Sequence, residues 1–391
     1  MTLSPSFRPD RMPVVEIDSS ALAANWRLLA ARNPGARTGA AVKADGYGLG
    51  AGKVASTLYN AGCRDFFVAW AGEGLAVRAA LDAAGEAEAA HDTRIFVLQG
   101  LEPASIPLHL SAGLTPVLST PDDIAVWREG LRSAGRRAPA AIQFETGMNR
   151  LGLNLADAQL ASALVASGEL DLSLVMSHLA SADETTDQSA RQRERFLALA
   201  ALLPGVPRSL ANSAGVFLGA DFGFDLTRPG IALYGGEAGP ASRGVLRPVA
   251  RLTAAILQLR TASAGEAAGY GAAAPLARDT RIATVGLGYA DGYQRAASGA
   301  GVAIRGLRAG TETFVAGRRV PVLGRVSMDL TLLDVTDLPE AALAPGDRVE
   351  FFGPNLPIDA VATAAGTIAY ELLTGLGPRV ERRWSTGAGL S

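Results

Sequence analysis

A lysine followed by a glycine-rich segment is the sharpest chemical feature of this sequence. In AVKADGYGLG, Lys43 comes directly after the apolar run 38–42, and Gly46, Gly48 and Gly50 follow it. Burial lowers the pKa of a lysine and favours the neutral amine that attacks aldehydes. Glycines let the backbone approach a ligand closely. A strand-end lysine that reaches back to water is the more common case, so the interpretation depends on what surrounds Lys43.

Eight short apolar runs alternate with helical patterns up to about Gly236. The runs are 38–44, 65–70, 94–99, 114–119, 139–145, 171–177, 208–212 and 228–234. They are apolar on both faces, as buried parallel strands are. Helices are expected at 19–31 and at 121–132, the second with a Thr120-Pro121 start signal. Eight alternations favour a (β/α)8 barrel over a doubly wound open sheet.

Such barrels carry their chemistry where the strands end, and polar residues recur there. Glu145 and Arg150 follow the fifth run, Ser177 and His178 end the sixth, Asn212 and Ser213 end the seventh, and Arg228 begins the eighth, before Pro229, Gly230 and Ile231. Hydroxyl and backbone N–H groups at these positions could bind a phosphate. Ordinary turn and helix-cap chemistry is the alternative. Together with Lys43 they predict a site for an anionic cofactor.

The second half of the sequence has a different pattern of apolar and polar residues. The runs 251–262, 280–293, 301–306 and 325–337 alternate apolar and polar residues, VEFFG follows, and one late helix is expected at about 358–376. We therefore expect a barrel over 1–236 and a mostly β domain over 237–391, joined through 235–248. Tyr270, Tyr289 and Met328 lie in the second domain, where isolated examples are usually core or interface residues.

Composition removes several classes of protein. The 391 residues are 48% hydrophobic and 19% charged, with a formal net charge of -2, so no basic stripe for nucleic acid and no membrane span is expected. One cysteine and three histidines without ligand-like spacing argue against a metal site. A reducing, cytoplasmic setting fits best. GYGLGA matches a loose dinucleotide pattern only weakly, and a P-loop fails because Tyr47 stands where a glycine is needed.

Nine segments taken together resemble bacterial alanine racemases, which are fold-type III enzymes that depend on pyridoxal phosphate. They are AVKADGYGLG, ETGMNRLG, MSHLASADE, ANSAG, RPGIALYG, AGYGA, VGLGYADGY, GRVSMDL and TIAYELL, in family order from residue 41 to 373. The resemblance implies a cofactor barrel followed by a mostly β domain. It also implies interconversion of L- and D-alanine for peptidoglycan, and an obligate homodimer in which each site is shared by two subunits.

The resemblance also implies roles for individual residues. Lys43 would hold the cofactor and act as one base, and Tyr270 from the partner subunit would act as the opposite base. His178 and Arg228 would link this tyrosine to the cofactor ring, with Arg228 facing the pyridine nitrogen. The remaining matches are Tyr47, Asn212, Ser213, Gly230, Ile231 and Tyr370 around the cofactor and its phosphate; Arg150 near the substrate carboxylate; Met328 from the partner; and Tyr289 in the substrate corridor.

The chain departs from the family pattern at a few positions. Gln143 stands where many relatives have a carbamylated lysine that steadies the arginine, here Arg150. Four further departures are Glu145, Leu49, Ser327 and Leu330. A racemase for serine or lysine, and a non-catalytic carrier of pyridoxal phosphate, remain alternatives. A decarboxylase of the same fold would need a cysteine near the substrate, whereas Cys63 lies far from the matched motifs. A plain structural barrel would not depend on Lys43 for any activity.

Overall fold

The computed structural model describes residues 11–83, 92–302, 310–386 and 390, which form two compact units. One unit spans 22–247, and the other combines the residues up to 21 with 248–391. The N-terminal residues join the second unit because β1 (Val14–Asp18) pairs with β11 (Ala250–Ala262) and with β19 (Glu381–Ser385). The expected division at 236 and 237 therefore differs from the observed units in both the N-terminal strand and the position of the junction.

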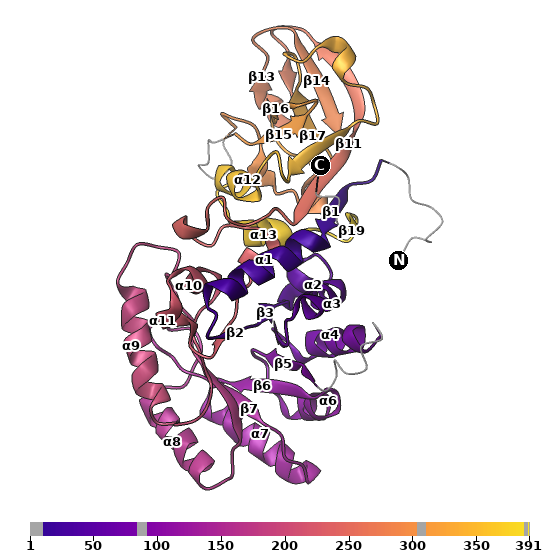
Figure 1. The fold of residues 1–391 in the computed structure, drawn as a ribbon. Helices are drawn as coiled ribbons and strands as arrows, with labels where there is room; N and C mark the ends of the chain where they lie inside the picture. The colour runs from indigo at the N-terminus through magenta and orange to yellow at the C-terminus, as the bar shows by residue number, and fades with distance from the viewer. Residues whose placement is uncertain (1–10, 84–91, 303–309, 387–389, 391) are drawn as a thin grey trace. The chain divides into compact units, whose positions relative to one another are not determined.

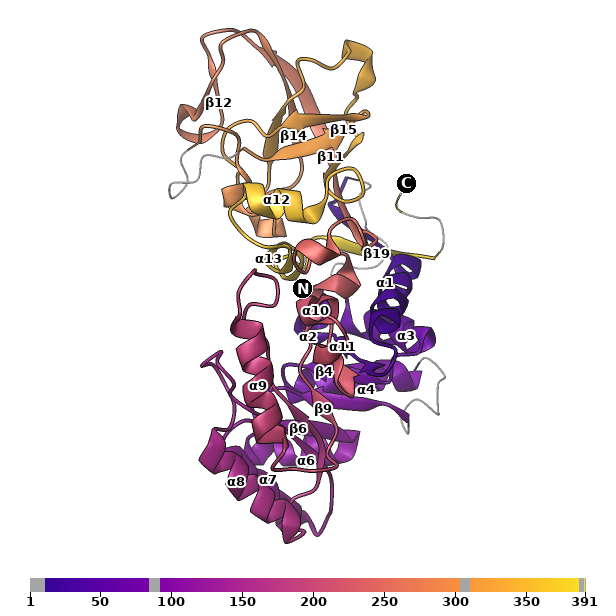
Figure 2. The same cartoon turned by 60° about the vertical axis from the view of Figure 1, so that its left-hand side comes forward.

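The unit 22–247 is built on parallel strands with helices outside (Figures 1 and 2). The strands are β2 Arg37–Thr38, β3 Ala40–Ala41, β4 Asp65–Val68, β5 Arg94–Val97, β6 Leu114–Leu118, β7 Ala140–Gln143, β8 Leu172–Met176, β9 Arg208–Ser209 and β10 Leu226–Thr227. The helices are α1 Ser19–Arg32, α2 Lys43–Tyr47, α3 Ala51–Ala61, α4 Ala71–Ala83, α6 Ile106–Ala112, α7 Pro121–Ala134, α8 Leu155–Ala166, α9 Gln188–Ala200, α10 Ser213–Phe217 and α11 Ala220–Gly223.

The sheet closes into a barrel through its first and last strands. Strands β3 to β9 pair side by side in chain order, and β10 pairs with β2. Only Gly39 separates β2 from β3, and its N–H donates to the Thr227 carbonyl oxygen over 2.9 Å. On the other side, the Asp225 N–H donates to the Arg208 carbonyl oxygen over 3.0 Å. Since β2 and β3 act as one interrupted strand, the predicted eight-stranded barrel is confirmed.

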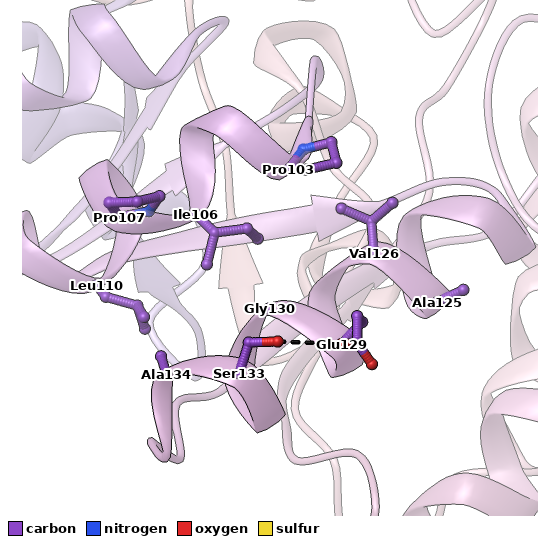
Figure 3. Close-up of a pocket in the computed structure, with 10 residues that line it drawn as sticks. All are labelled: Pro103, Ile106, Pro107, Leu110, Ala125, Val126, Glu129, Gly130, Ser133 and Ala134. Carbon is purple, nitrogen blue, oxygen red and sulfur yellow. Dashed lines mark hydrogen bonds between the residues drawn. The ribbon is translucent and has the colours of Figure 1, made fainter.

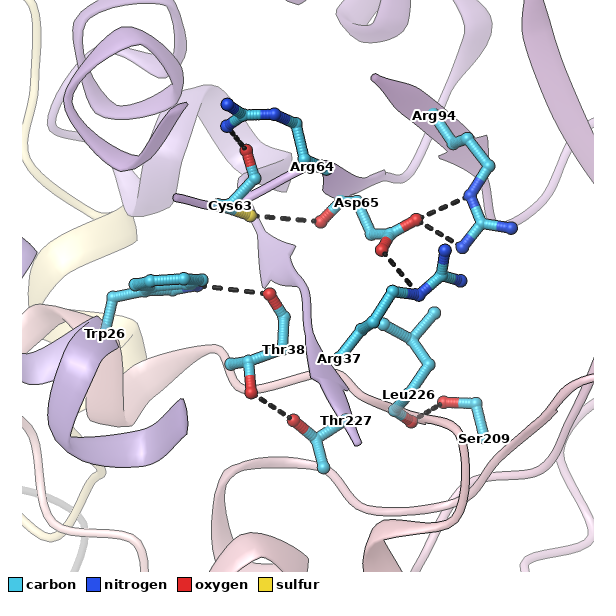
Figure 4. A network of polar contacts seen from close by, with 10 residues as sticks. All are labelled: Trp26, Arg37, Thr38, Cys63, Arg64, Asp65, Arg94, Ser209, Leu226 and Thr227. Carbon is cyan, nitrogen blue, oxygen red and sulfur yellow. Dashed lines mark hydrogen bonds and ion pairs between the residues drawn. The ribbon is translucent and has the colours of Figure 1, made fainter. Parts of the chain in front are cut away.

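Polar contacts join the strands where the first and the last meet (Figure 4). Asp65, at the start of β4, accepts a hydrogen bond from Nε of Arg94 over 2.7 Å and lies 3.6 Å from Nε of Arg37. The Thr227 hydroxyl donates to the Thr38 hydroxyl over 3.3 Å. These residues lie at strand starts, or in the two-residue strands of the closure, and their contacts stabilise the barrel.

Two details of the predicted elements are wrong. The eighth strand is β10, which ends at Thr227, so Arg228 follows the strand instead of beginning it, and Ile231–Tyr234 forms a 3-10 turn. The late helix is two helices, α12 (Ile358–Ala364) and α13 (Ala369–Thr374). The chain bends between them at Gly366, where φ is 68° and helix cannot continue. The predicted helices at 19–31 and 121–132 are confirmed as α1 and α7.

The second unit is mostly β, as predicted. Its sheet has the order β16-β15-β18-β11-β1-β19, and β14 and β17 extend it from β11. The strands not yet given are β12 Ala267–Ala268, β13 Ala274–Pro275, β14 Thr280–Val285, β15 Glu312–Val315, β16 Arg318–Pro321, β17 Thr331–Asp334 and β18 Arg348–Phe352. The expected run 301–306 lies mainly outside the described residues. In the described ranges, every helix is too short or too polar to cross a bilayer.

Candidate active site

Lys43 directly precedes a turn of left-handed helix. The next three residues, Ala44, Asp45 and Gly46, have φ of 52°, 52° and 63° with ψ of 50°, 49° and 43°, and Tyr47 has φ of 57°. Backbone hydrogen bonds of 2.8 Å from the Gly46 N–H to Val42 and from the Gly48 N–H to Ala44 hold it. For a non-glycine residue this conformation costs about 1–2 kcal/mol. A turn with three such residues therefore needs support from its surroundings, and it fixes where the Lys43 side chain starts.

The surroundings of Lys43, burial above all, oppose its protonation. Burial lowers the pKa of its amine, the positive charge of Arg150 lowers it further, and the negative charge of Glu73 acts in the opposite direction. A larger share of neutral amine makes Lys43 more nucleophilic than an exposed lysine. The sequence contains one other lysine, Lys53, which lies exposed on α3.

Arg228 and His178 lie in the same cationic cluster. Arg228 is buried; its guanidinium donates to the Ser177 carbonyl oxygen over 2.5 Å and to the Ser209 hydroxyl, and its pKa is lowered to about 9 by burial. It therefore stays protonated at neutral pH. Burial lowers the pKa of His178 to about 3, with further lowering by the charges of Arg228, Arg150 and Lys43. The imidazole is consequently neutral at physiological pH, among groups that attract an anion.

Ser213 and Gly230 are joined by a hydrogen bond, and Gly230 follows Arg228 by two residues. The buried Ser213 hydroxyl oxygen accepts hydrogen bonds from the backbone N–H groups of Gly230 and Ala232, over 2.7 and 3.3 Å. Asn212 caps α10 by accepting from the Gly215 N–H over 2.9 Å. Because two N–H groups hold its oxygen, the Ser213 hydroxyl can direct its own hydrogen to a further oxygen atom, such as one of a phosphate group.

Tyr47 limits the space above Gly230. Its ring stacks on that of Tyr234, with centroids 4.5 Å apart, and the Tyr234 hydroxyl donates to the Ala41 carbonyl oxygen over 2.9 Å. A Cβ atom on Gly230 would lie 2.2 Å from the Tyr47 hydroxyl oxygen, so only glycine allows this approach. The hydroxyl groups of Tyr47 and Ser213 fit a phosphate, and the lowered pKa of Lys43 fits an aldehyde. The residues present therefore fit pyridoxal phosphate.

The loop that carries Arg150 is held from two sides. The Gln143 side chain donates to the Leu151 carbonyl oxygen over 3.0 Å. The Glu145 carboxylate accepts from the N–H groups of Gly147 and Asn149, each over 2.7 Å. Gln143 thus fixes the residue next to Arg150 through the backbone, while Arg150 itself remains exposed.

Four predicted site residues lie in the β unit with exposed side chains. The exposed fractions are 70% for Tyr270, 41% for Tyr289, 54% for Met328 and 39% for Tyr370. Tyr289 and Met328 lie on neighbouring segments. The Tyr289 N–H donates to the Ser327 carbonyl oxygen over 3.0 Å, and the Ala290 N–H donates to the Met328 carbonyl oxygen over 2.9 Å. Large side chains left this exposed are typical of a surface that another molecule covers.

The barrel has a cavity between two of its helices (Figure 3). It measures about 690 Å³ and lies between α6 and α7, where Ile106, Leu110 and Val126 line it. None of the predicted site residues lines it. No group of three or more His, Cys, Asp or Glu side chains in the described ranges is placed to bind a metal ion.

Sequence reasoning missed Glu73 and the left-handed turn. Glu73 lies in the first turn of α4, where an acidic residue normally signals only a helix start. Nothing in the local pattern indicates that it reaches Ala44, 29 residues earlier. The turn escaped notice because Ala44, Asp45 and Tyr47 are not glycines, and positive φ is rare for such residues.

These features define the class: a barrel protein in which a half-buried lysine of lowered pKa lies among cationic groups, with a mostly β domain later in the chain. The family model of the alanine racemase N-terminal domain matches residues 17–238, and the family model of the alanine racemase C-terminal domain matches residues 249–384. The chain belongs to the alanine racemase family, and the predicted family and fold are confirmed.

Relatives match over nearly the whole chain. An alanine racemase of Rhizobium meliloti (strain 1021) is 47% identical over 95% of this chain and 96% of its own length. A biosynthetic alanine racemase of Agrobacterium fabrum is 46% identical over 94% and 92%. The crystal structure of alanine racemase from Bartonella henselae with covalently bound pyridoxal phosphate has a TM-score of 0.86 and 35% identity, covering 96% of this chain and 99% of that one.

Proposed function

We propose that this protein interconverts L-alanine and D-alanine with pyridoxal phosphate, as a homodimer whose two active sites are each built from both subunits. The observation that carries the proposal is the half-buried Lys43, whose pKa is lowered within a cluster that contains Arg150, His178 and Arg228. Membership in the alanine racemase family supports the same conclusion.

Two bases on opposite faces of the substrate explain racemisation. Lys43 would hold the cofactor, and its amine would remove or return the proton at Cα on one face of the substrate. Tyr270 of the partner subunit does the same on the other face. Proton removal on one side and return on the other inverts the centre, which a single base on one face cannot do without moving. When bound, pyridoxal phosphate withdraws electrons from Cα and so makes its proton acidic.

Arg228 and His178 set the electronic environment. A guanidinium keeps its proton, so Arg228 would donate a hydrogen bond to the cofactor ring without giving up its proton. Such a partner would limit electron withdrawal and so favour return of the proton to Cα. His178, neutral because burial and the neighbouring cations lower its pKa, passes hydrogen bonds between Arg228 and the tyrosine base without adding charge.

The remaining site residues bind and orient the substrate and the cofactor. Arg150 pairs with the substrate carboxylate, as guanidinium groups do in bidentate fashion. The partner's Met328 contacts the substrate and Tyr289 lines its corridor. Tyr47, Ser213, Gly230, Ile231 and Tyr370, with Asn212 as the cap of α10, bind the cofactor and its phosphate. The D-alanine formed serves peptidoglycan synthesis in a bacterial cytoplasm.

Mixing two inactive variants tests the shared site. Lys43→Ala and Tyr270→Phe proteins should each be inactive, but hybrid dimers contain one site with both bases. Activity should therefore return after the two are unfolded, mixed and refolded together. Persistent inactivity, with hybrid dimers demonstrated by mass spectrometry, would mean that the two bases come from one chain. Parallel assays with L-serine and L-lysine decide between alanine and the alternative substrates.

A further inference from the structure

The Glu73 carboxylate joins two segments that the chain separates. One oxygen accepts a hydrogen bond of 2.7 Å from the Ala44 N–H, in the peptide that follows Lys43. The other accepts from the N–H groups of Ala69 and Trp70, over 2.7 and 3.2 Å, in the loop between β4 and α4. A single carboxylate thus ties the start of the left-handed turn to the end of the neighbouring strand through three charge-assisted bonds.

The bond to Ala44 acts at the start of the left-handed turn. Ala44 is the first left-handed residue, and its N–H belongs to the peptide plane that follows the Lys43 Cα. Fixing that plane fixes the direction in which the Lys43 side chain leaves the backbone. Both terminal atoms of the Glu73 side chain must be acceptors, because N–H donors meet both of its carboxylate oxygens.

Asp123 shows what a purely local cap looks like in this barrel. It occupies the first turn of α7, and one of its oxygens accepts from the N–H groups of Ser119 and Thr120, over 2.9 and 3.0 Å. Both bonds stay within the loop between β6 and α7. Glu73 makes the equivalent two bonds with one oxygen and adds the bond to Ala44 with the other, so capping alone does not account for it.

We propose that Glu73 is a positioning residue for Lys43: its carboxylate holds the left-handed turn and supplies the negative charge that faces the amine. This deepens the proposed function and rests on Lys43 being the cofactor lysine. Burial and the charge of Arg150 lower the pKa of Lys43, and the charge of Glu73 raises it, so Glu73 contributes to how much of the amine is neutral at a given pH. Loss of this charge lowers the pKa of Lys43 further.

The two lysines of the sequence allow a direct test in the cofactor-free full chain. Brief acetylation with acetic anhydride across a pH series, read by mass spectrometry, gives the pH midpoint of each amine, with exposed Lys53 as the internal reference. In Glu73→Gln the Lys43 midpoint should move to lower pH while that of Lys53 stays. Asp123→Asn should change neither. In Glu73→Asp, which keeps the charge, the Lys43 midpoint should lie near that of the wild type.

Hydrogen exchange and kinetics provide second readouts. The peptide containing Ala44 should exchange faster in Glu73→Gln than in the wild type or in Asp123→Asn, and the holoenzyme should lose kcat several-fold with little change in KM. An unchanged Lys43 midpoint in folded Glu73→Gln, or an equal shift in Asp123→Asn, would overturn the proposal. If the wild type does not racemise alanine, the proposed function fails instead, while the comparison of midpoints still decides the role of Glu73.

Discussion

The hydroxyl oxygen of Ser213 accepts a hydrogen bond of 2.7 Å from the backbone N–H of Gly230. The two residues follow β9 and β10, the strands next to the closure of the barrel, and each comes from a different loop. Their contact brings a hydroxyl group and backbone donors together on one side of Tyr47. The proposed phosphate cradle therefore depends on correct closure of the barrel.

Gly230→Ala should weaken cofactor binding. The added Cβ would lie 2.2 Å from the Tyr47 hydroxyl oxygen but 3.0 Å from its ring carbon Cζ. Removal of that hydroxyl in Tyr47→Phe should therefore relieve most of the clash. We expect the affinity for pyridoxal phosphate, measured by fluorescence titration, to fall about tenfold or more in Gly230→Ala. A smaller loss should follow when Gly230→Ala is added to Tyr47→Phe, and equal losses in both backgrounds would contradict the proposed contact.

Lys43→Ala should abolish covalent attachment of the cofactor, because an alanine supplies no amine. Since Lys53 is the other lysine of the sequence, Lys53→Ala is the matched control and should attach the cofactor as the wild type does. Borohydride reduction followed by mass spectrometry gives the site directly. Label retained in Lys43→Ala and lost in Lys53→Ala would refute the assignment.

His178 should make the stability of the cofactor-free protein depend on pH. Its pKa is about 3 in the folded chain and near 6.5 when unfolded, so the unfolded chain binds more protons between these values. The contribution of neutral His178 to the free energy of unfolding should therefore be fully present above pH about 6.5 and decline as the pH falls toward about 3. In His178→Asn, urea unfolding should show a shallower decline, while His109, whose pKa is also lowered by burial, keeps its own share. Equal declines in both proteins would contradict the low pKa of His178.

Gln143→Leu should impair substrate binding. The change keeps the size of the side chain but removes the donor to the Leu151 carbonyl oxygen, beside Arg150. Loss of one such hydrogen bond costs about 1 kcal/mol, which corresponds to roughly a fivefold lower kcat/KM. Steady-state kinetics should place most of the effect in KM, because the loop orients the carboxylate-binding residue. An unchanged KM would show that the loop is held without Gln143.

Most of the fold could be predicted from the sequence because the patterns that indicate strands and helices are local. Apolar runs and helix starts such as Thr120-Pro121 depend on neighbours a few residues apart, and α1 and α7 appear where the pattern predicts them. The prediction of the eighth strand was wrong because the segment RPGIALY, although rich in strand-forming residues, follows β10. Its residues Ile231–Tyr234 form a 3-10 helix, and Gly230 lies beside Ser213. Tertiary packing overrides local propensity there.

The site was predictable in part. Residues at strand ends, such as Lys43, His178 and Arg228, could be placed together because all parallel strands end at one face. Glu73 could not be found, because its bond to Ala44 joins positions 29 residues apart and leaves no local trace. The tyrosine base remains a proposal that rests on the family resemblance, since Tyr270 belongs to the β unit and its side chain is exposed.

Incubation of the purified protein with L-alanine and pyridoxal phosphate in heavy water tests the central claim most directly. The wild type should place deuterium at Cα and form D-alanine together, because each inversion takes its new proton from a base in exchange with solvent. Tyr270→Phe should keep the visible absorbance of the bound cofactor and lose D-alanine formation by about a hundredfold or more. Unchanged D-alanine formation in Tyr270→Phe, or a wild type that binds the cofactor but neither exchanges nor inverts alanine, would contradict the account.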